Sequence, residues 1–333
     1  MTFPVLVTGA AGFIGFHVAK ALLARGNAVV GIDNLNDYYD PQLKRDRLLA
    51  LDEVGGDFTF RQCDFADSEA LDVALTGLDF KHIVHLGAQA GVRYSLENPG
   101  AYVQSNLVGH LNILELARHR NTKHLVCASS SSVYGQNAKI PFSVADRTDR
   151  PVSLYAATKK ADELISESYA HLYRIPMTGL RFFTVYRPWG RPDMAPWLFT
   201  EAMLSGSPIK VFNDGKMRRD FTYIDDIVAG VIGTLDLPPV DDGNLKPGGS
   251  ISQHAIYNIG NNRSEELSRL IAVIEAACGR EAEKIMLPMQ PAGVPVTYAD
   301  IDNIVRDIGY APATTIDLGL PAFVEWFRAY KGV

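Results

Sequence analysis

Several residue types and patterns are scarce in this chain of 333 residues, and each scarcity excludes a class of function. The three cysteines lie far apart and form no CxxC pair, which argues against a disulfide framework and a zinc site. The eight histidines include no HExxH motif, so we expect no metal at the functional site. No run of about 18 uncharged apolar residues is present, so we expect no membrane-spanning helix.

Basic residues are also in the minority, with 32 Lys and Arg against 38 Asp and Glu, a net charge of −6. General nucleic-acid-binding proteins usually carry a basic excess, so we expect no nucleic-acid partner. A small anion remains a possible ligand because it needs only a few well-placed cations. The start of the sequence shows no basic stretch followed by an apolar run and a cleavage site, so we expect a cytoplasmic protein.

Short β-branched runs alternate with amphipathic segments through the first half of the chain. This alternation is typical of a parallel sheet covered by helices on both faces, and right-handed crossovers then give a doubly wound, Rossmann-like α/β fold. The expected strands are Pro4–Thr8, Ala28–Asp33, Thr59–Asp64, Lys81–Leu86, His124–Ser129 and Thr178–Phe183. The expected helices are Phe13–Arg25, Asp37–Gly55 on the surface, Ser68–Leu75 with Ser68 as its N-cap, Ala101–His119 and Tyr155–Tyr173.

The character of the chain changes after about Val185, where prolines and aromatic residues become dense. At about 100–200 residues per domain, the length also suggests two units. We therefore expect a larger domain over residues 1–185, to which residues 220–260 partly return, and a smaller C-terminal α/β domain over residues 186–333.

A glycine-rich turn, GAAGFIG from Gly9 through Gly12 to Gly15, follows the first expected strand and begins a helix. Missing side chains let a pyrophosphate approach the backbone, and the helix N-terminus offers N–H donors and the positive end of its dipole. Asp33 ends the second strand, where an acidic side chain binds the adenosine ribose hydroxyls and repels a 2′-phosphate, which favours NAD over NADP. For the glycines alone, a turn without a ligand remains the alternative.

Tyr155 and Lys159 lie four residues apart at the start of an expected long helix, so they share one helical face. An isolated tyrosine is a poor base at neutral pH, but a nearby ammonium group favours the phenolate and makes a general base available. A YxxxK pair also arises by chance, as a half-buried tyrosine beside a lysine. The serine run 129–132 ends the fifth strand, where open parallel sheets bind ligands, but the run does not reveal which hydroxyl acts.

Together these motifs make the chain resemble the extended short-chain dehydrogenase/reductase family over essentially its whole length. Further segments narrow the resemblance to nucleotide-sugar epimerases that act at C4 of UDP-glucuronate, with residues 189–195 the most discriminating. These segments are Asp33–Tyr39, Ala88–Ser95, Trp189–Ala195 and Arg219–Ile224. The resemblance implies NAD in residues 1–185, the UDP-sugar in residues 186–333, and reversible epimerisation to UDP-galacturonate through a transient 4-keto sugar.

The resemblance also assigns residues by position. The family's active hydroxyl lies 25 residues before the tyrosine, so the expected catalytic residues are Ser130, Tyr155 and Lys159. Positions that match cofactor contacts are Gly9, Gly12, Phe13, Ile14, Gly15, Asp33, Asn34, Asp64, Phe65, Gly87, Ala88, Gln89, Asn106 and Lys159. Positions that match UDP-sugar contacts are Arg93, Ser130, Ser131, Ser132, Tyr155, Thr184, Arg191, Val211, Phe212 and Arg219.

Two positions depart from the family pattern. Arg187 stands where glycine is usual, and we expect it to add a cation beside the sugar pocket. Gly293 stands where aspartate is usual, and we expect the loss of a contact to the uridine ribose. Ser131 and Ser132 stand where related 4,6-dehydratases and UDP-glucuronate decarboxylases carry carboxylates, which argues against both activities. A 4-epimerase of UDP-galactose or a UDP-pentose remains an alternative, as does a non-catalytic NAD-sensing protein.

The helices expected at Ala101–His119 and Tyr155–Tyr173 match those that the family uses to form a homodimer through a four-helix bundle, so we expect a homodimer. Their apolar residues must pack against the sheet and, in a dimer, against the partner. The sequence alone does not divide these residues between the two roles. They are Leu107, Leu111, Leu114, Leu164, Ile165 and Leu172.

Overall fold

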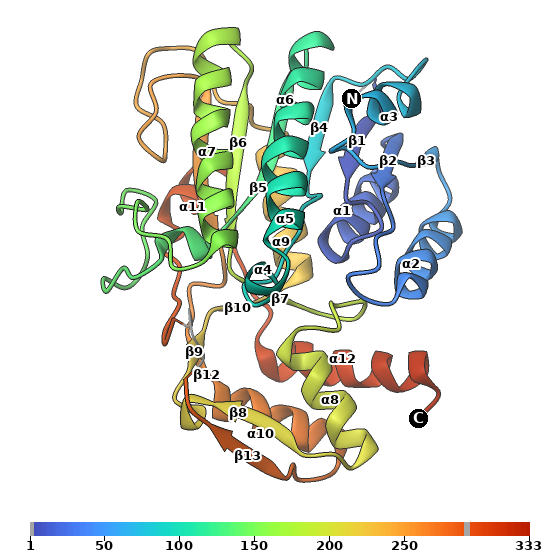
Figure 1. Ribbon diagram of the computed structural model, residues 1–333, viewed down its shortest axis with the longest axis vertical. Helices are drawn as coiled ribbons and strands as arrows, with labels where there is room; N and C mark the ends of the chain where they lie inside the picture. The colour runs from blue at the N-terminus through green and yellow to red at the C-terminus, as the bar shows by residue number, and fades with distance from the viewer. Residues whose placement is uncertain (1–2, 290–293) are drawn as a thin grey trace.

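A computed structural model describes residues 3–289 and 294–333, and its largest element is one parallel sheet (Figure 1). Within these residues the sheet has seven strands in the order β11-β6-β5-β4-β1-β2-β3. They are β1 (Val5–Thr8), β2 (Val29–Asp33), β3 (Phe58–Gln62), β4 (His82–His85), β5 (His124–Ser130), β6 (Met177–Phe182) and β11 (His254–Ile259). The order reverses between β1 and β4, the place where open sheets bind ligands. The predicted doubly wound α/β fold is confirmed.

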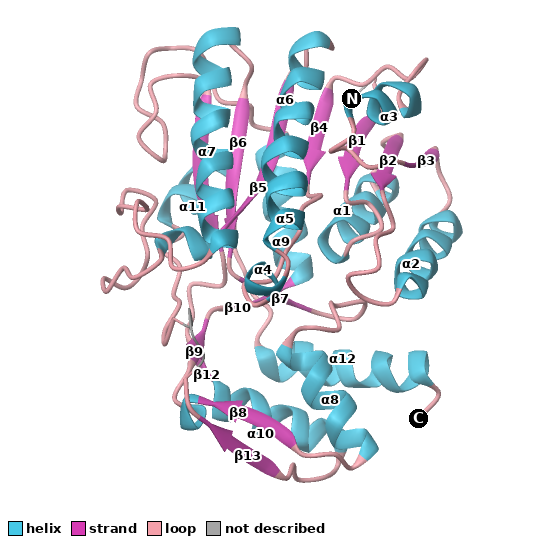
Figure 2. Ribbon diagram, in the orientation of Figure 1, coloured by secondary structure: helices cyan, strands magenta, loops and turns pink. Residues whose placement is uncertain are grey.

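Both faces of the sheet are buried because successive side chains of a strand point to opposite faces. In β1, Val5 and Val7 join the core on one face, whereas Leu6 joins the core on the other. Helices of the first core are α1 (Phe13–Ala24) and α9 (Ile224–Leu235), and those of the second are α3 (Ser68–Ala74), α6 (Gly109–His119) and α7 (Leu154–Tyr173). Figure 2 shows these helices in front of and behind the strands.

A smaller lobe lies beyond the carboxyl ends of the strands, at the bottom of Figure 1. Its own core gathers large side chains such as Trp197, Ile271 and Phe323. The elements of this part are β7 (Thr184–Tyr186), α8 (Ala195–Ser205), β8 (Ile209–Phe212), β9 (Arg218–Arg219), β10 (Phe221–Tyr223), β12 (Glu265–Glu266), α10 (Leu267–Cys278), β13 (Lys284–Leu287) and α12 (Ile316–Lys331). A further helix, α11 (Asp302–Ile308), packs against β11 of the main sheet.

The helix predicted on the surface at residues 37–55 is partly buried. It is α2 (Pro41–Val54), and Leu43, Lys44 and Arg47 are among its buried residues. The guanidinium of Arg47 donates hydrogen bonds to the carbonyl oxygens of Ala11 at 2.9 Å and Trp189 at 2.7 Å. The helix does lie at the surface, as predicted, with Arg45, Leu49 and Glu53 exposed. Its other face is covered by segments distant in sequence, the glycine-rich turn and the chain at Trp189.

Two other predicted helices differ in detail. The helix expected at residues 101–119 is built from α5 (Pro99–Tyr102), a π-helical segment (Val103–Val108) and α6, and it follows a short helix, α4 (Tyr94–Glu97). The N-cap of α3 is Asp67 and not Ser68, since the Asp67 carboxylate accepts hydrogen bonds from the N–H groups of Glu69 and Ala70. No described helix combines the length and apolarity needed to cross a membrane.

Candidate active site

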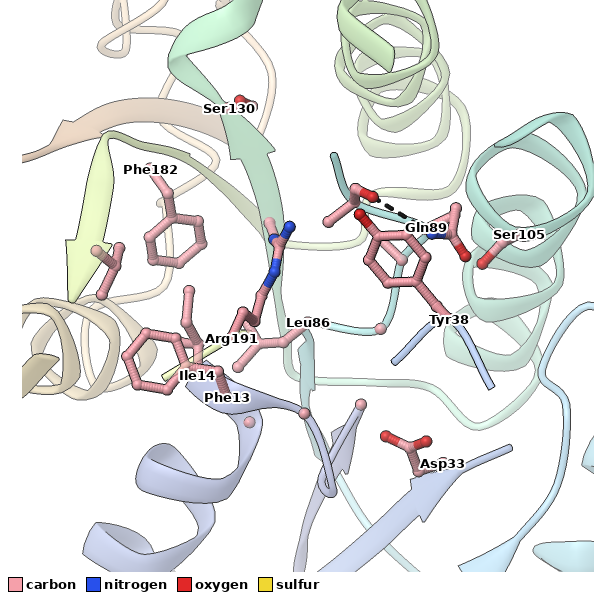
Figure 3. A pocket seen from close by; sticks show the side chains of 18 of the residues that line it. Phe13, Ile14, Asp33, Tyr38, Leu86, Gln89, Ser105, Ser130, Phe182 and Arg191 are labelled. Carbon is pink, nitrogen blue, oxygen red and sulfur yellow. Dashed lines mark hydrogen bonds between the residues drawn. The ribbon is translucent and has the colours of Figure 1, made fainter. Parts of the chain in front are cut away.

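A pocket runs along the carboxyl ends of β1, β2, β4 and β5. Figure 3 shows Asp33 and Ser130 far apart in this pocket, with Tyr38 and Arg191 in the space between them. The pocket joins the glycine-rich turn to the expected catalytic side chains. The predicted site residues that line it are Gly9, Gly12, Phe13, Ile14, Gly15, Asp33, Asn34, Phe65, Gly87, Ala88, Gln89, Ser130, Tyr155, Lys159 and Arg191.

The glycine-rich turn is packed too closely for side chains. Gly9 has a φ of +68°, and a Cβ atom there would lie 2.8 Å from the Gly87 nitrogen. A Cβ atom at Gly15 would lie 2.0 Å from the Gly9 oxygen. Gly12 is the N-cap of α1 and offers no side-chain cap, so N–H groups of the first turn stay available to an anion. This cradle fits the pyrophosphate of a dinucleotide.

The far end of the pocket fits an adenosine ribose. Asp33 is buried, and its Oδ1 accepts a hydrogen bond from the N–H of Leu35 at 2.9 Å. Burial raises the pKa of Asp33, although the charge of Lys44 opposes that effect. Lys44, which was not predicted from the sequence, lines the same pocket and donates a hydrogen bond to the Asn36 side chain at 2.7 Å. A single lysine in the charged stretch 37–55 carries no pattern that would have revealed it.

Helix α7 places both Tyr155 and Lys159 on the pocket. The Lys159 ammonium is buried and donates hydrogen bonds to the Ala128 carbonyl oxygen and to Asp162 Oδ2, each at 3.0 Å. Burial by itself lowers the pKa of Lys159, but the negative charges of Asp162 and Tyr155 outweigh burial and raise it. Lys159 therefore stays a cation beside the tyrosine at neutral pH.

The four serines at the end of β5 have separate surroundings. Ser129 donates to Glu163 Oε1 at 2.6 Å and so belongs to a buried network. Ser130 Oγ accepts the N–H of Ser132 at 3.2 Å, which leaves its hydroxyl proton free to be donated into the pocket. Ser131 and Ser132 line the adjoining pocket. The geometry thus favours Ser130 as the hydroxyl nearest the expected chemistry.

The adjoining pocket shares Tyr38, Met194 and Arg191 with the first. Arg93 lies with its guanidinium 5.1 Å from the centre of the Phe212 ring. Within the described part of the chain, Arg219 donates only to the carbonyl oxygens of Arg218 and Pro295. Burial lowers the pKa of Arg219 to about 10, so it stays charged at neutral pH. The predicted substrate residues that line this pocket are Arg93, Ser131, Ser132, Thr184, Arg191, Phe212 and Arg219.

Arg191 stands at the junction of the two pockets and is restrained by an acidic neighbour. Its Nε donates to Asp193 Oδ1 at 2.9 Å and its terminal nitrogen to Asp193 Oδ2 at 2.5 Å. The Tyr38 hydroxyl donates to the same Asp193 Oδ2 at 3.0 Å. Asp193 and Tyr38 were quoted within family segments but not predicted as site residues, because their contact joins positions 155 residues apart.

Three predicted site residues line neither of these pockets. Asp64 Oδ2 accepts a hydrogen bond from the Asn34 side chain at 3.1 Å, beside the first pocket. Asn106 lies behind Gln89, whose N–H it accepts at 2.8 Å, and it donates to Thr158. Val211 is buried in the core of the smaller lobe.

The two departures from the family pattern have different outcomes. Arg187 lines neither pocket, because Asp225 pairs with its guanidinium and His17 Nδ1 lies 3.4 Å from it. The prediction that Arg187 adds a cation beside the sugar pocket is therefore wrong. Gly293 lies outside the described residues.

Comparisons with known proteins agree with this geometry. A family model described as "NAD dependent epimerase/dehydratase family" matches residues 5–260. A probable UDP-glucuronate 4-epimerase of Rhizobium meliloti (strain 1021) is 48% identical, over 97% of this chain and 96% of that relative. UDP-glucuronate 4-epimerase 2 of Arabidopsis thaliana is also 48% identical, over 98% of this chain and 76% of the plant protein.

A solved structure also resembles this chain over nearly its whole length. The UDP-glucuronic acid 4-epimerase from Bacillus cereus, in complex with UDP-glucuronic acid and NAD, is 32% identical to this chain. The two superpose with a TM-score of 0.86, over 98% of this chain and 100% of that one. The resemblance inferred from the sequence is thereby confirmed, and the chain belongs to the NAD-dependent epimerase/dehydratase family.

Proposed function

We propose that this protein interconverts UDP-glucuronate and UDP-galacturonate through transient oxidation at C4, with NAD as a resident cofactor. The observation that carries the proposal is one pocket lined by the glycine-rich turn, Asp33 and the side chains of Tyr155 and Lys159. Arg191 extends this pocket into the adjoining one. Relatives named UDP-glucuronate 4-epimerase, and the Bacillus cereus complex with UDP-glucuronic acid and NAD, support the same activity.

Bound NAD supplies the acceptor for the hydride that leaves C4 and its donor on return. The protein moves the proton: Tyr155, as a phenolate, accepts it from the C4 hydroxyl and later gives it back. The Ser130 hydroxyl donates a hydrogen bond to the same sugar oxygen and keeps its own proton. Lys159 has three N–H donors, of which Ala128 and Asp162 occupy two, so one remains for the site.

Epimerisation also requires the 4-keto sugar to present its other face. We therefore assign the firm contacts to the diphosphate, where the guanidinium groups of Arg93 and Arg219 have no carboxylate partner among the described residues. The sugar is held more loosely and turns about its diphosphate link. The proposal divides the work between residues 1–185, which hold NAD and the catalytic groups, and residues 186–333, which supply Arg191 and Arg219.

Arg191 favours a uronic acid over the alternative sugars. A 4-epimerase of UDP-galactose or a UDP-pentose has no substrate carboxylate for a guanidinium at this junction. A dehydratase or decarboxylase needs a carboxylate after the active hydroxyl, and Ser131 and Ser132 line the adjoining pocket there instead. A non-catalytic NAD-sensing protein would not need both Tyr155 and Lys159 on the pocket.

The purified protein tests the proposal when it is incubated with UDP-glucuronate and no added NAD, and the nucleotide sugars are separated by anion-exchange chromatography. We expect UDP-galacturonate from the wild type. We expect Tyr155→Phe to retain NAD, measured spectroscopically after denaturation, but to lose at least 100-fold in rate, on the order of what proton transfer contributes. A Tyr155→Phe variant as fast as the wild type would exclude Tyr155 as the base.

We also propose that the protein is a homodimer joined through α6 and α7. Figure 1 shows these helices side by side over one face of the sheet. Leu111, Leu164 and Leu172 are exposed on them, with exposed fractions of 41%, 60% and 62%. Leu114 is fully buried, whereas Leu107 and Ile165 are half-buried. The cytoplasmic location stays a prediction, and a place in polysaccharide biosynthesis is a further prediction from the family resemblance.

A further inference from the structure

Asp162 lies one helical turn after Lys159 on α7, behind the proposed active site. Both side chains are almost fully buried, Asp162 with 4% and Lys159 with 3% of the residue exposed. Asp162 Oδ2 accepts the hydrogen bond from Lys159 Nζ at 3.0 Å, whereas Asp162 Oδ1 is buried without a hydrogen-bond partner in the described part of the chain. A buried carboxylate with one unpartnered oxygen costs free energy, so packing alone gives no reason for an aspartate here.

The other titratable groups around Lys159 are neutral or paired elsewhere, so Asp162 is its counter-charge. Burial raises the pKa of the Cys127 thiol to about 12 and lowers the pKa values of the His85 and His110 imidazoles, so all three groups are neutral near pH 7. Glu163, the next residue, is bound instead by Arg181, Ser129 and Lys160. The titratable groups that face Lys159 are Asp162 and Tyr155 from α7, Cys127 from β5, His85 from β4 and His110 from α6.

We propose that Asp162 is a positioning residue for the epimerisation, which anchors the Lys159 ammonium and sets the upper end of the pH range in which Lys159 works as a cation. The inference rests on the proposed function. The carboxylate fixes one of the three ammonium hydrogens, the Ala128 carbonyl fixes the second, and the third is left for the pocket.

The charge of Asp162 stabilises the protonated form of Lys159, so the lysine keeps its charge to higher pH. The alkaline end of the active pH range therefore lies higher than it would without Asp162.

The test compares Asp162→Asn, which keeps the shape and removes the charge, with Asp72→Asn on α3. Asp72 is exposed on α3, so the Asp72→Asn substitution changes the net charge by the same amount but far from the site. In kcat/KM against pH for UDP-glucuronate, we expect the alkaline limb of the Asp162→Asn profile to move by about 1–3 pH units toward acid. The Asp72→Asn profile should overlay the wild type. A lower rate with an unmoved alkaline limb would assign Asp162 a structural role and overturn the proposal.

A second readout does not depend on turnover. The ¹³Cε resonance of Lys159 in the holoenzyme, assigned through Lys159→Arg, reports the charge of the lysine directly. We expect Lys159 to lose its proton at lower pH in Asp162→Asn than in the wild type, and identical titrations would overturn the proposal. Suppose that Lys159 loses its proton at higher pH in the wild type than in Asp162→Asn, but the wild type makes no UDP-galacturonate. The proposed function then fails, and the role of Asp162 at Lys159 stands. Should Asp162→Asn not fold, Asp162→Ala is measured with the same expectations.

Discussion

Among single residues, we propose that Arg191 protects the 4-keto uronic acid intermediate from decarboxylation. A ketone at C4 beside the C5 carboxylate makes a β-keto acid, which loses CO₂ when the breaking bond aligns with the carbonyl π system. A guanidinium that pairs with both carboxylate oxygens holds the group out of this alignment. Asp193 and Tyr38 restrain Arg191 at the junction of the two pockets, so its position is set before substrate arrives.

Arg191→Ala should therefore raise the share of a decarboxylated 4-keto pentose among the products. The share of decarboxylated product should rise about tenfold for each ~1.4 kcal/mol by which the barrier to decarboxylation falls. Mass spectrometry of the nucleotide sugars measures it, with the exposed Arg147→Ala as the matched control. Purely epimeric products at a reduced rate would show that Arg191 does not govern the alignment.

The place of family-motif residues on the pocket was predictable, and the place of residues that depend on distant partners was not. Asp33 and Lys159 stand at fixed distances from other motif residues, so the sequence located them. Lys44 could be placed on the pocket only once its contact with Asn36 was seen. The role of Asp162 could be inferred only from the burial of Asp162 and Lys159. Arg187 was misjudged because its partner Asp225 begins another helix, which a linear pattern does not bring close.

Among the elements, α7 carries Tyr155 and Lys159, the proposed catalytic pair, and is fixed to the sheet by a buried network. Glu163 accepts two hydrogen bonds from Arg181 of β6, at 2.8 and 2.9 Å, and one from Ser129 of β5. Arg181 also donates to the Tyr134 hydroxyl, which in turn donates to Asn258 of β11. The network thus ties α7 to three neighbouring strands and holds Tyr155 and Lys159 against the pocket.

Glu163→Gln should lower the free energy of unfolding by about 3–5 kcal/mol near neutral pH, because it leaves the Arg181 charge buried without a counter-charge. Burial by itself raises the pKa of Glu163, but the hydrogen bonds and charge of Arg181 outweigh burial and lower it from 4.5 to about 2. Since the folded pKa is the lower one, this stabilisation is complete above about pH 4.5 and is lost as pH falls toward 2.

Denaturant unfolding at several pH values measures this effect. The difference between the wild type and Glu163→Gln should narrow on acidification, whereas the exposed Glu53→Gln should match the wild type throughout. A difference that stays constant as pH falls would mean that the Glu163 carboxylate is not the stabilising group.

Element order was predictable from alternation, but irregular geometry was not. Six strands and their helices followed from short β-branched runs between amphipathic segments. The π-helical segment Val103–Val108 leaves the apolar pattern almost unchanged, so it was predicted as ordinary helix. β11 pairs with β6 although His254 and its partner Met177 are far apart in sequence, and such a pairing is set by tertiary packing.

Across the whole molecule, a net charge of −6 is compatible with a ligand that carries two phosphates. The groups suited to anions are few and local: the first turn of α1 and the guanidinium groups of Arg93, Arg191 and Arg219. They come from both the main sheet and the smaller lobe, which meet at the carboxyl ends of the strands (Figure 1). Binding of this ligand therefore depends on where the positive groups lie and not on the net charge of the protein.

The proposed homodimer depends on the exposed leucines of α7. Replacing the exposed Leu164 and Leu172 of α7 together by lysine should convert a dimer into a folded monomer, since buried lysines at the interface would lose their hydration. Light scattering after size-exclusion chromatography gives the mass, and circular dichroism confirms the fold. Leu318→Lys, on the exposed face of α12, is the control and should leave the dimer intact. A doubly substituted protein that stays dimeric would place the interface elsewhere.

The epimerisation itself is tested by UDP-glucuronate carrying deuterium at C4, incubated with the protein as purified and without added NAD. Hydride that leaves C4 and returns within one active site does not exchange with water. We therefore predict UDP-galacturonate that retains the deuterium at C4, seen by NMR and mass spectrometry. Failure to form UDP-galacturonate, or a product whose C4 deuterium has been replaced by solvent hydrogen, would contradict the mechanism assigned to Tyr155, Lys159 and the NAD pocket.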